Sequence, residues 1–277
     1  MKIIKDLPGS YASKVELVEI DGEKYVLKTW NTEETVNEKL LLKTLAEHGL
    51  PSLQVVNHAE LKPDQILLEY IEDSPKLPKS PENYARFGQA VRKMHDIKYT
   101  ESFKINEMGE REVVDWNDFL KSKLAEGIKK QRNEETDIEE EILVAIQTFV
   151  ERRLPFKISE FSLLHADLHT GNVLVQKEDL IIYDKNPEIF AGDPLYEFAT
   201  LLTHYPNGTY IKTDNPSNQK DREFLDNFIK GYGFDFLTKN REVIDVYFIV
   251  KALLRYPSPW EPYSKEAIKN IVYRKFQ

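Results

Sequence analysis

The strongest constraint on the fold of this chain is a polar loop that lies between short apolar runs. The loop reads HADLHTGN over residues 165–172, and β-branched and apolar residues flank it on both sides. A charged turn then leads into the apolar run 180–183, which ends at Asp184. Short apolar runs bounded by turn residues are typical of strands. The pattern predicts a hairpin that carries Asp167 and Asp184 to the same end of a small sheet.

Three polar side chains of this segment suit magnesium-dependent phosphoryl transfer. That reaction needs an aligned acceptor hydroxyl, a group that receives its proton, and a cation that neutralises the phosphate oxygens. Asp167 could receive the proton. Asn172 and Asp184 could bind Mg2+, which prefers oxygen ligands and usually takes only one or two carboxylates. A lone His-x-Asp is more often an ordinary turn, but the flanking strands and the second carboxylate favour the catalytic interpretation.

The order of these parts resembles the aminoglycoside phosphotransferase family, whose relatives include choline, fructosamine, homoserine and methylthioribose kinases. The resemblance rests on His-x-Asp-x-x-x-x-Asn, on the strand that ends at Asp184, and on Gly-Asp-Pro at 192–194. It implies an α+β, bilobal protein-kinase-like fold, in which an antiparallel sheet with one helix precedes a mainly helical lobe that carries the catalytic hairpin. The parts would be a nucleotide-binding lobe at 1–71, a linker at 72–80 and an acceptor-binding lobe at 81–277.

The resemblance also implies which residues contact the nucleotide. Lys28 lies in a strand-like run after an Asp-Gly turn, and Glu38 lies in a helix that should begin near Thr32. In the family such a lysine binds the phosphates of ATP or GTP and pairs with the helical glutamate. A small-residue loop whose N–H groups can approach phosphate, and a strand end that can meet the adenine edge, complete the expected site. These residues are Gly9, Ser10 and Ser13 in the loop, and Glu69, Tyr70 and Ile71 at the strand end.

Two residues are expected to support the catalytic loop rather than to contact the substrate. His165 would hydrogen-bond within the loop, with a charged contact to phosphate as the alternative, and Asp193 would buttress the loop through hydrogen bonds. The chain also departs from the family at two positions. Ala166 stands where glycine is common, and Lys185 follows Asp184 where an aromatic or acidic residue is more usual. Lys185 could contact phosphate or compete with the metal.

The acceptor is expected to be a hydroxyl of a small molecule. The segment between Asp184 and Gly192 is shorter than the activation segment of protein kinases, and no Ala-Pro-Glu follows it. Carboxylates would suit polycationic aminoglycosides, as in antibiotic resistance, whereas aromatic faces would suit choline-like metabolites. Candidates of both kinds are present, each with the alternative of a helix cap or a proline-rich connection. They are Asp115, Asp118, Glu188, Trp260 and Glu261.

Composition limits the class of protein and its partners. A chain of 277 residues with 41% hydrophobic residues can bury the core of one two-lobed unit. The net charge of -9 argues against nucleic acid as a partner, because phosphate backbones are bound by basic surfaces. The absence of cysteine excludes disulfides and cysteine zinc sites. No apolar segment follows Met1 and no run reaches membrane-span length, so we expect a soluble cytoplasmic protein without a membrane or obligate protein partner.

Three functions are compatible with these residues. The leading one is an ATP- or GTP-dependent small-molecule kinase, acting on an aminoglycoside or on a metabolite of the choline, homoserine or fructosamine type. The second is a kinase-like enzyme that acts on a protein, and the third is a nucleotide-binding regulatory protein without turnover. The presence of Lys28, Asp167, Asn172 and Asp184 counts against the third.

Overall fold

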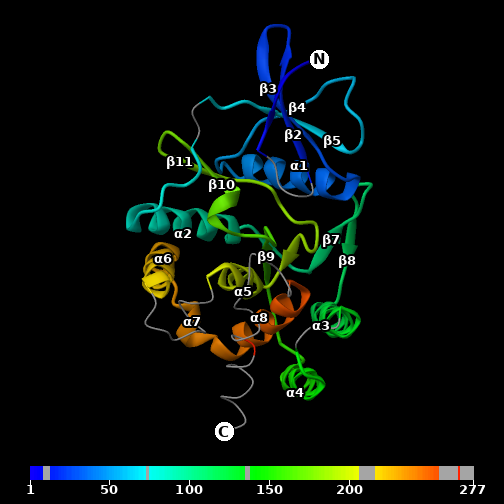
Figure 1. Ribbon diagram of the computed structural model, residues 1–277, viewed down its shortest axis with the longest axis vertical. Helices are drawn as coiled ribbons and strands as arrows, with labels where there is room; N and C mark the ends of the chain where they lie inside the picture. The colour runs from blue at the N-terminus through cyan, green and yellow to red at the C-terminus, as the bar shows by residue number, and fades with distance from the viewer. Residues whose placement is uncertain (9–12, 73–74, 135–137, 206–215, 256–267, 269–277) are drawn as a thin grey trace. The chain divides into compact units, whose positions relative to one another are not determined.

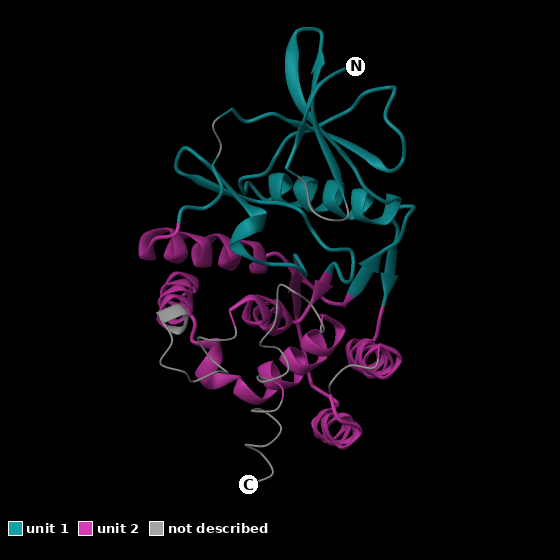
Figure 2. Ribbon diagram, in the orientation of Figure 1, with its two compact units in different colours: residues 1–78, 103–113, 165–190 teal, residues 79–102, 114–164, 191–277 magenta. Residues whose placement is uncertain are grey.

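The computed structural model describes residues 1–8, 13–72, 75–134, 138–205, 216–255 and 268 (Figure 1). The chain forms two compact units, each built from three segments (Figure 2). Unit 1 contains residues 1–78, 103–113 and 165–190, and unit 2 contains residues 79–102, 114–164 and 191–277. The catalytic hairpin thus groups with the N-terminal sheet rather than with the helices, which differs from the division expected at 71 and 80. The lobe boundaries stay a prediction.

A five-stranded antiparallel sheet lies in unit 1, with the strand order β1-β2-β3-β5-β4. The strands are β1 (Lys2–Leu7), β2 (Lys14–Ile20), β3 (Glu23–Thr29), β4 (Val55–Val56) and β5 (Gln65–Glu69). Asp21 and Gly22 join β2 to β3 with φ angles of 51° and 85°, which suit a tight turn between twisted strands. The predicted Asp-Gly hairpin and the strand that contains Lys28 are therefore present.

One helix, α1 (Thr32–Glu47), packs against β4 and β5 of this sheet. It begins after Asn31, whose side-chain oxygen accepts a hydrogen bond from the N–H of Glu34 at 2.9 Å. It is followed by Gly49, which has a φ of 68° that glycine adopts without steric cost. The helix predicted to begin near Thr32 is present.

The predicted catalytic hairpin also lies in unit 1. Its elements are a 3-10 turn (Thr170–Asn172), β10 (Val173–Gln176) and the antiparallel β11 (Asp179–Ile182). Ile181 is buried in one apolar cluster with Leu42 of α1 and Leu68 of β5, which explains why the hairpin groups with the sheet. A second hairpin of unit 1 consists of β7 (Phe103–Ile105) and β8 (Arg111–Val113).

Unit 2 is mainly helical. Its helices are α2 (Pro81–His95), α3 (Trp116–Asn133), α4 (Glu140–Glu151), α5 (Pro194–His204), α6 (Pro216–Tyr232), α7 (Phe236–Lys239) and α8 (Arg241–Arg255). Its short strands are β6 (Lys98–Tyr99), β9 (Phe161–Leu163) and β12 (Ala191–Gly192), and β9 pairs with both of the others. Across the described part of the chain, none of the helices combines the length and apolarity that a membrane crossing requires.

Helices α2 and α6 approach each other closely at two glycines. A Cβ atom on Gly88 would lie 2.1 Å from the carbonyl oxygen of Phe228, and one on Gly231 would lie 1.8 Å from the carbonyl oxygen of Ala85. Beside this contact the rings of Phe87 and Phe228 meet edge to face, with centroids 5.3 Å apart. The helices can therefore touch backbone to backbone only because both positions lack a side chain.

Candidate functional site

The loop predicted to be catalytic, residues 165–172, is held in shape by its own histidine. His165 is completely buried, its Nε2 donates a hydrogen bond to the Tyr183 carbonyl at 2.7 Å, and its Nδ1 accepts one from the N–H of Asp167 at 3.3 Å. This pattern requires the hydrogen on Nε2 and the lone pair on Nδ1. Ala166 has a left-handed φ of 66°, the conformation that glycine adopts most easily. The geometry favours the supporting role of His165 over a contact with phosphate.

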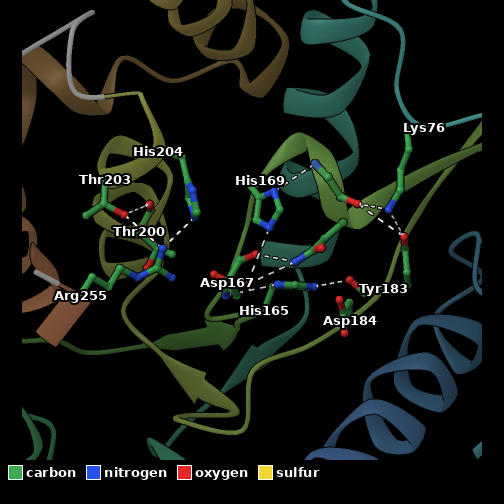
Figure 3. A network of polar contacts seen from close by, with 12 residues as sticks. Lys76, His165, Asp167, His169, Tyr183, Asp184, Thr200, Thr203, His204 and Arg255 are labelled. Carbon is green, nitrogen blue, oxygen red and sulfur yellow. Dashed lines mark hydrogen bonds and ion pairs between the residues drawn. The ribbon is translucent and has the colours of Figure 1, made fainter. Parts of the chain in front are cut away.

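Asp167 and Asn172 face each other across this loop. The Nδ2 atom of Asn172 donates hydrogen bonds to the backbone carbonyl of Asp167 at 3.0 Å and to its carboxylate at 3.4 Å. Because the amide nitrogen is used in this way, its oxygen is the atom that Asn172 can offer to a cation. His169 lies beside the pair, with its Nε2 3.7 Å from the Asp167 carboxylate (Figure 3). The Asp167 side chain is 31% exposed, so a substrate can reach it.

A buried charge network joins the sheet, α1 and the hairpin. The ammonium of Lys28 lies 3.3 Å from the Glu38 carboxylate and also contacts the carboxylate of Asp184. The other oxygen of Glu38 accepts a hydrogen bond from the Asp184 N–H at 2.9 Å. Lys28 is further positioned 4.0 Å from the centre of the Trp30 ring. The structure thus brings together the lysine, the glutamate and the second aspartate of the sequence prediction, although Lys28 and Asp184 are 156 residues apart.

Lys28 and Asp184 of this network line a cavity of about 610 Å³ in unit 1. Its walls come from β1, β2, β3 and β5, the segment before β4, the residues that follow β5, and the hairpin. The apolar residues that line it are Leu7, Pro8, Val15, Val26, Leu53, Leu68, Ile71 and Leu174. Its charged and polar lining includes Lys28, Asp167, Asn172 and Asp184. Mostly apolar walls with a few convergent polar groups are typical of small-molecule sites of this size. Ser13 also lines the cavity, whereas Gly9 and Ser10 lie outside the described residues.

Of the three residues expected to contact adenine at the end of β5, Glu69 differs from Tyr70 and Ile71. The backbone N–H of Glu69 donates to the carbonyl of Gln54 at 3.0 Å, and the Glu69 carboxylate accepts the N–H of Gln54 at 2.8 Å. Both groups of Glu69 are therefore bonded to the residue that precedes β4. Tyr70 and Ile71 line the cavity directly after it and are the better candidates for backbone contacts with a base.

Lys185 has neither of the two roles considered for it. The side chain is completely buried, and its ammonium donates to the carbonyls of Asn186 at 2.9 Å and Ile189 at 2.6 Å. It also lies 5.2 Å from the centre of the Phe190 ring. The buried ammonium therefore links two backbone carbonyls of the loop that follows Asp184. These hydrogen bonds explain how a charged residue fits where an aromatic one is more usual.

Asp193 caps α5 and links it to α8 in unit 2. It precedes α5, its carboxylate accepts the N–H of Leu195 at 2.9 Å, and its second oxygen accepts the hydroxyl of Tyr247 at 2.8 Å. Burial raises the pKa of Asp193, while these two hydrogen bonds act in the opposite direction. Tyr247 in turn accepts the indole N–H of Trp116 at 2.9 Å. The helix expected after Gly-Asp-Pro is present, and the support of the catalytic loop by Asp193 stays a prediction.

The candidate acceptor residues lie in varied settings. Asp115 is the N-cap of α3 and accepts the N–H of Asp118 at 2.9 Å, which is the alternative considered for it. Asp118 is exposed and pairs with Lys121 at 3.0 Å. Glu188 is half-buried in the loop after Asp184, and its N–H donates to the side chain of Asn186. Trp260 and Glu261 lie outside the described residues. Their part in acceptor binding stays a prediction.

Sequence reasoning missed Lys76, which lines the same cavity. Its ammonium contacts the carbonyl of Gly171 and the hydroxyl of Tyr183 (Figure 3). The residue lies in a proline-bearing stretch that predicts no regular element, so no periodicity pointed to it. The available signal was a cation a few residues beyond β5, the strand whose end lines this cavity.

Solved structures with a similar fold are kinases and phosphotransferases. A thermostable mutant of aminoglycoside phosphotransferase APH(4)-Ia in its apo form is 14% identical with a TM-score of 0.64, and the match covers 98% of this chain and 94% of that one. Amicoumacin kinase hAmiN in complex with AMP-PNP, Ca2+ and Ami is 17% identical with a TM-score of 0.61, over 96% and 87%. An ethanolamine kinase of Plasmodium vivax is 14% identical with a TM-score of 0.58, over 98% and 83%. At these identities the likeness shows the fold alone, which is the expected α+β protein-kinase-like fold.

The family follows from the sequence match. The model of the phosphotransferase enzyme family (APH) matches residues 3–242, and this chain belongs to that family. No curated protein matches the chain. The resemblance inferred from the catalytic loop, and the expectation of a phosphotransferase enzyme, are confirmed.

Proposed function

We propose that this protein transfers the terminal phosphoryl group of ATP or GTP to a hydroxyl group of a small molecule. The observation that carries the proposal is the convergence of Asp167, Asn172, Asp184 and Lys28 on one cavity of unit 1. Such a reaction depends on alignment and charge neutralisation more than on covalent help from the protein. The four groups supply an acceptor for a proton, two oxygen ligands and a cation.

Asp167 is proposed to orient the acceptor hydroxyl and to receive its proton. Its position is fixed from two directions, by the hydrogen bond of its N–H to His165 and by the amide of Asn172 on its carbonyl. The partly exposed carboxylate is placed to meet a hydroxyl, as a general base must be.

Asn172 and Asp184 are proposed to hold Mg2+. Their amide and carboxylate oxygens fit the preference of this ion for hard oxygen ligands, and two protein ligands leave room for phosphate oxygens and water. When bound, the ion would neutralise the charge on the phosphate oxygens. Glu38 supports the arrangement, because it binds the Asp184 N–H with one oxygen and the Lys28 ammonium with the other.

The nucleotide donor is proposed to lie along the cavity, with its base between the apolar walls and its phosphates toward Lys28. Tyr70 and Ile71 would meet the base through backbone groups, with Glu69 beside them. Ser13, which directly precedes β2, lines the cavity. Gly9 and Ser10 of the same loop are proposed as further phosphate contacts. Solved structures with this fold contain AMP-PNP or ADP, which supports a nucleotide donor.

The acceptor is proposed to be an aminoglycoside-like antibiotic or a small metabolite, in a cytoplasmic setting. Similar folds were solved with hygromycin B and with spectinomycin, and others are named as choline or ethanolamine kinases. Both kinds of acceptor carry hydroxyl groups. The likeness to each is comparable, so the proposal keeps both.

The test is a screen for acceptor-dependent release of nucleoside diphosphate, with ATP or GTP and Mg2+. The panel comprises aminoglycosides, spectinomycin, choline, ethanolamine, homoserine and fructosamines. With the acceptor found, Asp167→Ala is expected to lower kcat by about 10²- to 10⁴-fold, because the proton acceptor is removed.

Binding of the nucleotide to Asp167→Ala, measured by calorimetry, is expected to stay close to that of the unaltered protein, since Asp167 contacts the acceptor. Asp226→Ala is the matched control, because that carboxylate is exposed on α6 and does not line the cavity. Equal turnover of the Asp167→Ala variant and the unaltered protein would contradict the proposal.

A further inference from the structure

The stretch that contains Lys76 is tied to the catalytic hairpin by backbone pairing. Lys76 forms an isolated antiparallel bridge with Leu174 of β10, and the N–H of Val175 donates to the carbonyl of Pro75 at 3.1 Å. This segment lies a few residues beyond β5, whose C-terminal end lines the cavity. The fold therefore holds Lys76 beside the hairpin, although the residue as a whole is exposed to solvent.

The Lys76 ammonium joins two residues that occupy equivalent places beside the proposed metal ligands. It contacts the carbonyl of Gly171 at 2.5 Å and the hydroxyl of Tyr183 (Figure 3). Gly171 directly precedes Asn172, and Tyr183 directly precedes Asp184. One cation thus bridges the segment that enters the hairpin and the segment that leaves it, at the residue before each ligand.

Two further contacts close this arrangement. The N–H of Tyr183 donates to the carbonyl of Asn172 at 3.2 Å, and the Tyr183 hydroxyl lies 3.4 Å from the Gly171 carbonyl. The ammonium of Lys76 also lies 5.1 Å from the centre of the Tyr183 ring. Movement of either ligand relative to the other would have to break the bridge.

The charge environment separates Lys76 from Lys28. Lys28 contacts two carboxylates, whereas the contacts of Lys76 in the described part of the chain are a carbonyl, a hydroxyl and a ring, all neutral. Packing around its ammonium lowers the pKa of Lys76, and the nearby Asp184 acts in the opposite direction. The lysine therefore connects neutral groups and does not neutralise a carboxylate directly.

We propose that Lys76 is a positioning residue that sets the spacing of Asn172 and Asp184 by bridging the residues before them. The inference rests on the proposed function, in which these two side chains bind a divalent cation. Partners that orient metal ligands from outside the coordination shell typically change metal affinity by 10- to 100-fold when they are removed.

The test is a direct measurement of Mn2+ binding in the presence of saturating ADP, by electron paramagnetic resonance or calorimetry, on the full chain. Lys76→Met is expected to weaken Mn2+ binding by about 10- to 100-fold. Lys76→Arg keeps a cation that can reach both oxygens and is expected to restore most of the affinity. Lys79→Met is the matched control, because that lysine is exposed three residues further along the chain.

A second variant keeps the test independent of any folding defect at position 76. Tyr183→Phe removes one of the two bridged oxygens and is expected to weaken Mn2+ binding by a smaller factor. In the double variant with Lys76→Met the two effects are expected to be non-additive, since they remove one shared interaction. If the losses of Mn2+ affinity in the two single variants were additive in the double variant, the proposed bridge would be refuted.

Two outcomes distinguish this inference from the proposed function. If the unaltered protein binds no Mn2+ with ADP, and Asp184→Asn makes no difference, the proposed metal site itself is wrong. If the unaltered protein binds Mn2+ and Lys76→Met binds it equally well, only the inference is wrong. If Lys76→Met lowered the affinity for ADP as much in EDTA as in the presence of Mn2+, Lys76 would be assigned to direct nucleotide binding. That result would also overturn the inference.

Discussion

At the scale of single residues, the charges of the site are buried more deeply than stability alone would favour. Glu38 is completely buried and Lys28 is 5% exposed, and both are held with Asp184 in one network. Burying such groups costs free energy that their mutual attraction offsets only with good geometry, and removal of one partner typically costs about 3–5 kcal/mol. A buried network of this kind is better explained by a functional demand on Lys28 than by its contribution to folding.

His95 is a buried residue whose effect can be measured through pH. It lies at the end of α2, its Nδ1 is 3.1 Å from the hydroxyl of Tyr232, and its Nε2 has no hydrogen-bond partner among the described residues. Burial, with a smaller effect of Lys98 and Arg92, lowers the pKa of His95 from 6.5 to about 3. The folded protein thus holds this histidine neutral throughout the mildly acidic range.

The free energy of unfolding is expected to fall as the pH is lowered from about 6.5 toward 3. The unfolded chain takes up a proton on His95 in this window and the folded chain does not, so the stability present above pH 6.5 is lost at up to about 1.4 kcal/mol per pH unit. Denaturant unfolding at several pH values would measure this slope. In His95→Gln the part of the slope due to this residue should disappear, and equal slopes for both proteins would show that His95 does not cause it.

At the scale of secondary-structure elements, the contact between α2 and α6 is the sharpest packing constraint. Gly88→Ala would place a methyl group 2.1 Å from the Phe228 carbonyl, so one helix must shift. We expect a loss of about 1–3 kcal/mol in the free energy of unfolding. Gln89→Ala, at an exposed position of the same helix, is the control and should change stability little. If Gly88→Ala proved as stable as the control, the close approach of the two helices would be refuted.

The elements also show what sequence could predict and what it could not. The hairpin around Asp167, the strand with Lys28 and the helix from Thr32 each carry a local signal, either a period, a turn or a cap, and each is present. Lys76 and the buried position of Lys185 depend on which segments meet in three dimensions. No period or turn residue encodes such a meeting, and for that reason the sequence does not point to Lys76 and leaves the role of Lys185 open.

At the scale of the whole molecule, each compact unit is assembled from segments that are distant in the chain. Unit 1 takes its sheet from the first 78 residues and its catalytic hairpin from residues 165–190. The candidate site lies in this unit, and its charge network joins residues 156 positions apart. The site therefore forms only when both segments are folded together, and binding at the site should stabilise the folded chain.

We expect ADP with Mg2+ to raise the melting temperature by about 5 to 10 °C at a ligand concentration near 100 times Kd, because binding of this strength adds about 2.7 kcal/mol to stability. Thermal unfolding followed by circular dichroism measures the shift. Asp184→Asn should lose the part of the shift that depends on Mg2+ and keep the part that ADP gives in EDTA. An identical shift with and without the metal in the unaltered protein would argue against Asp184 as a ligand.

The left-handed backbone at Ala166 and Asp184 has a consequence for how this chain can diverge. Both residues have φ angles near 70°, at 66° and 69°, where most side chains cost about 1–2 kcal/mol and aspartate and asparagine cost less. Glutamate at position 184 would keep the carboxylate but would bring a longer side chain that tolerates this conformation poorly. Asparagine would keep the backbone but would lose the charge. Evolutionary change at this position is therefore restricted twice, by the chemistry of the side chain and by the path of the main chain.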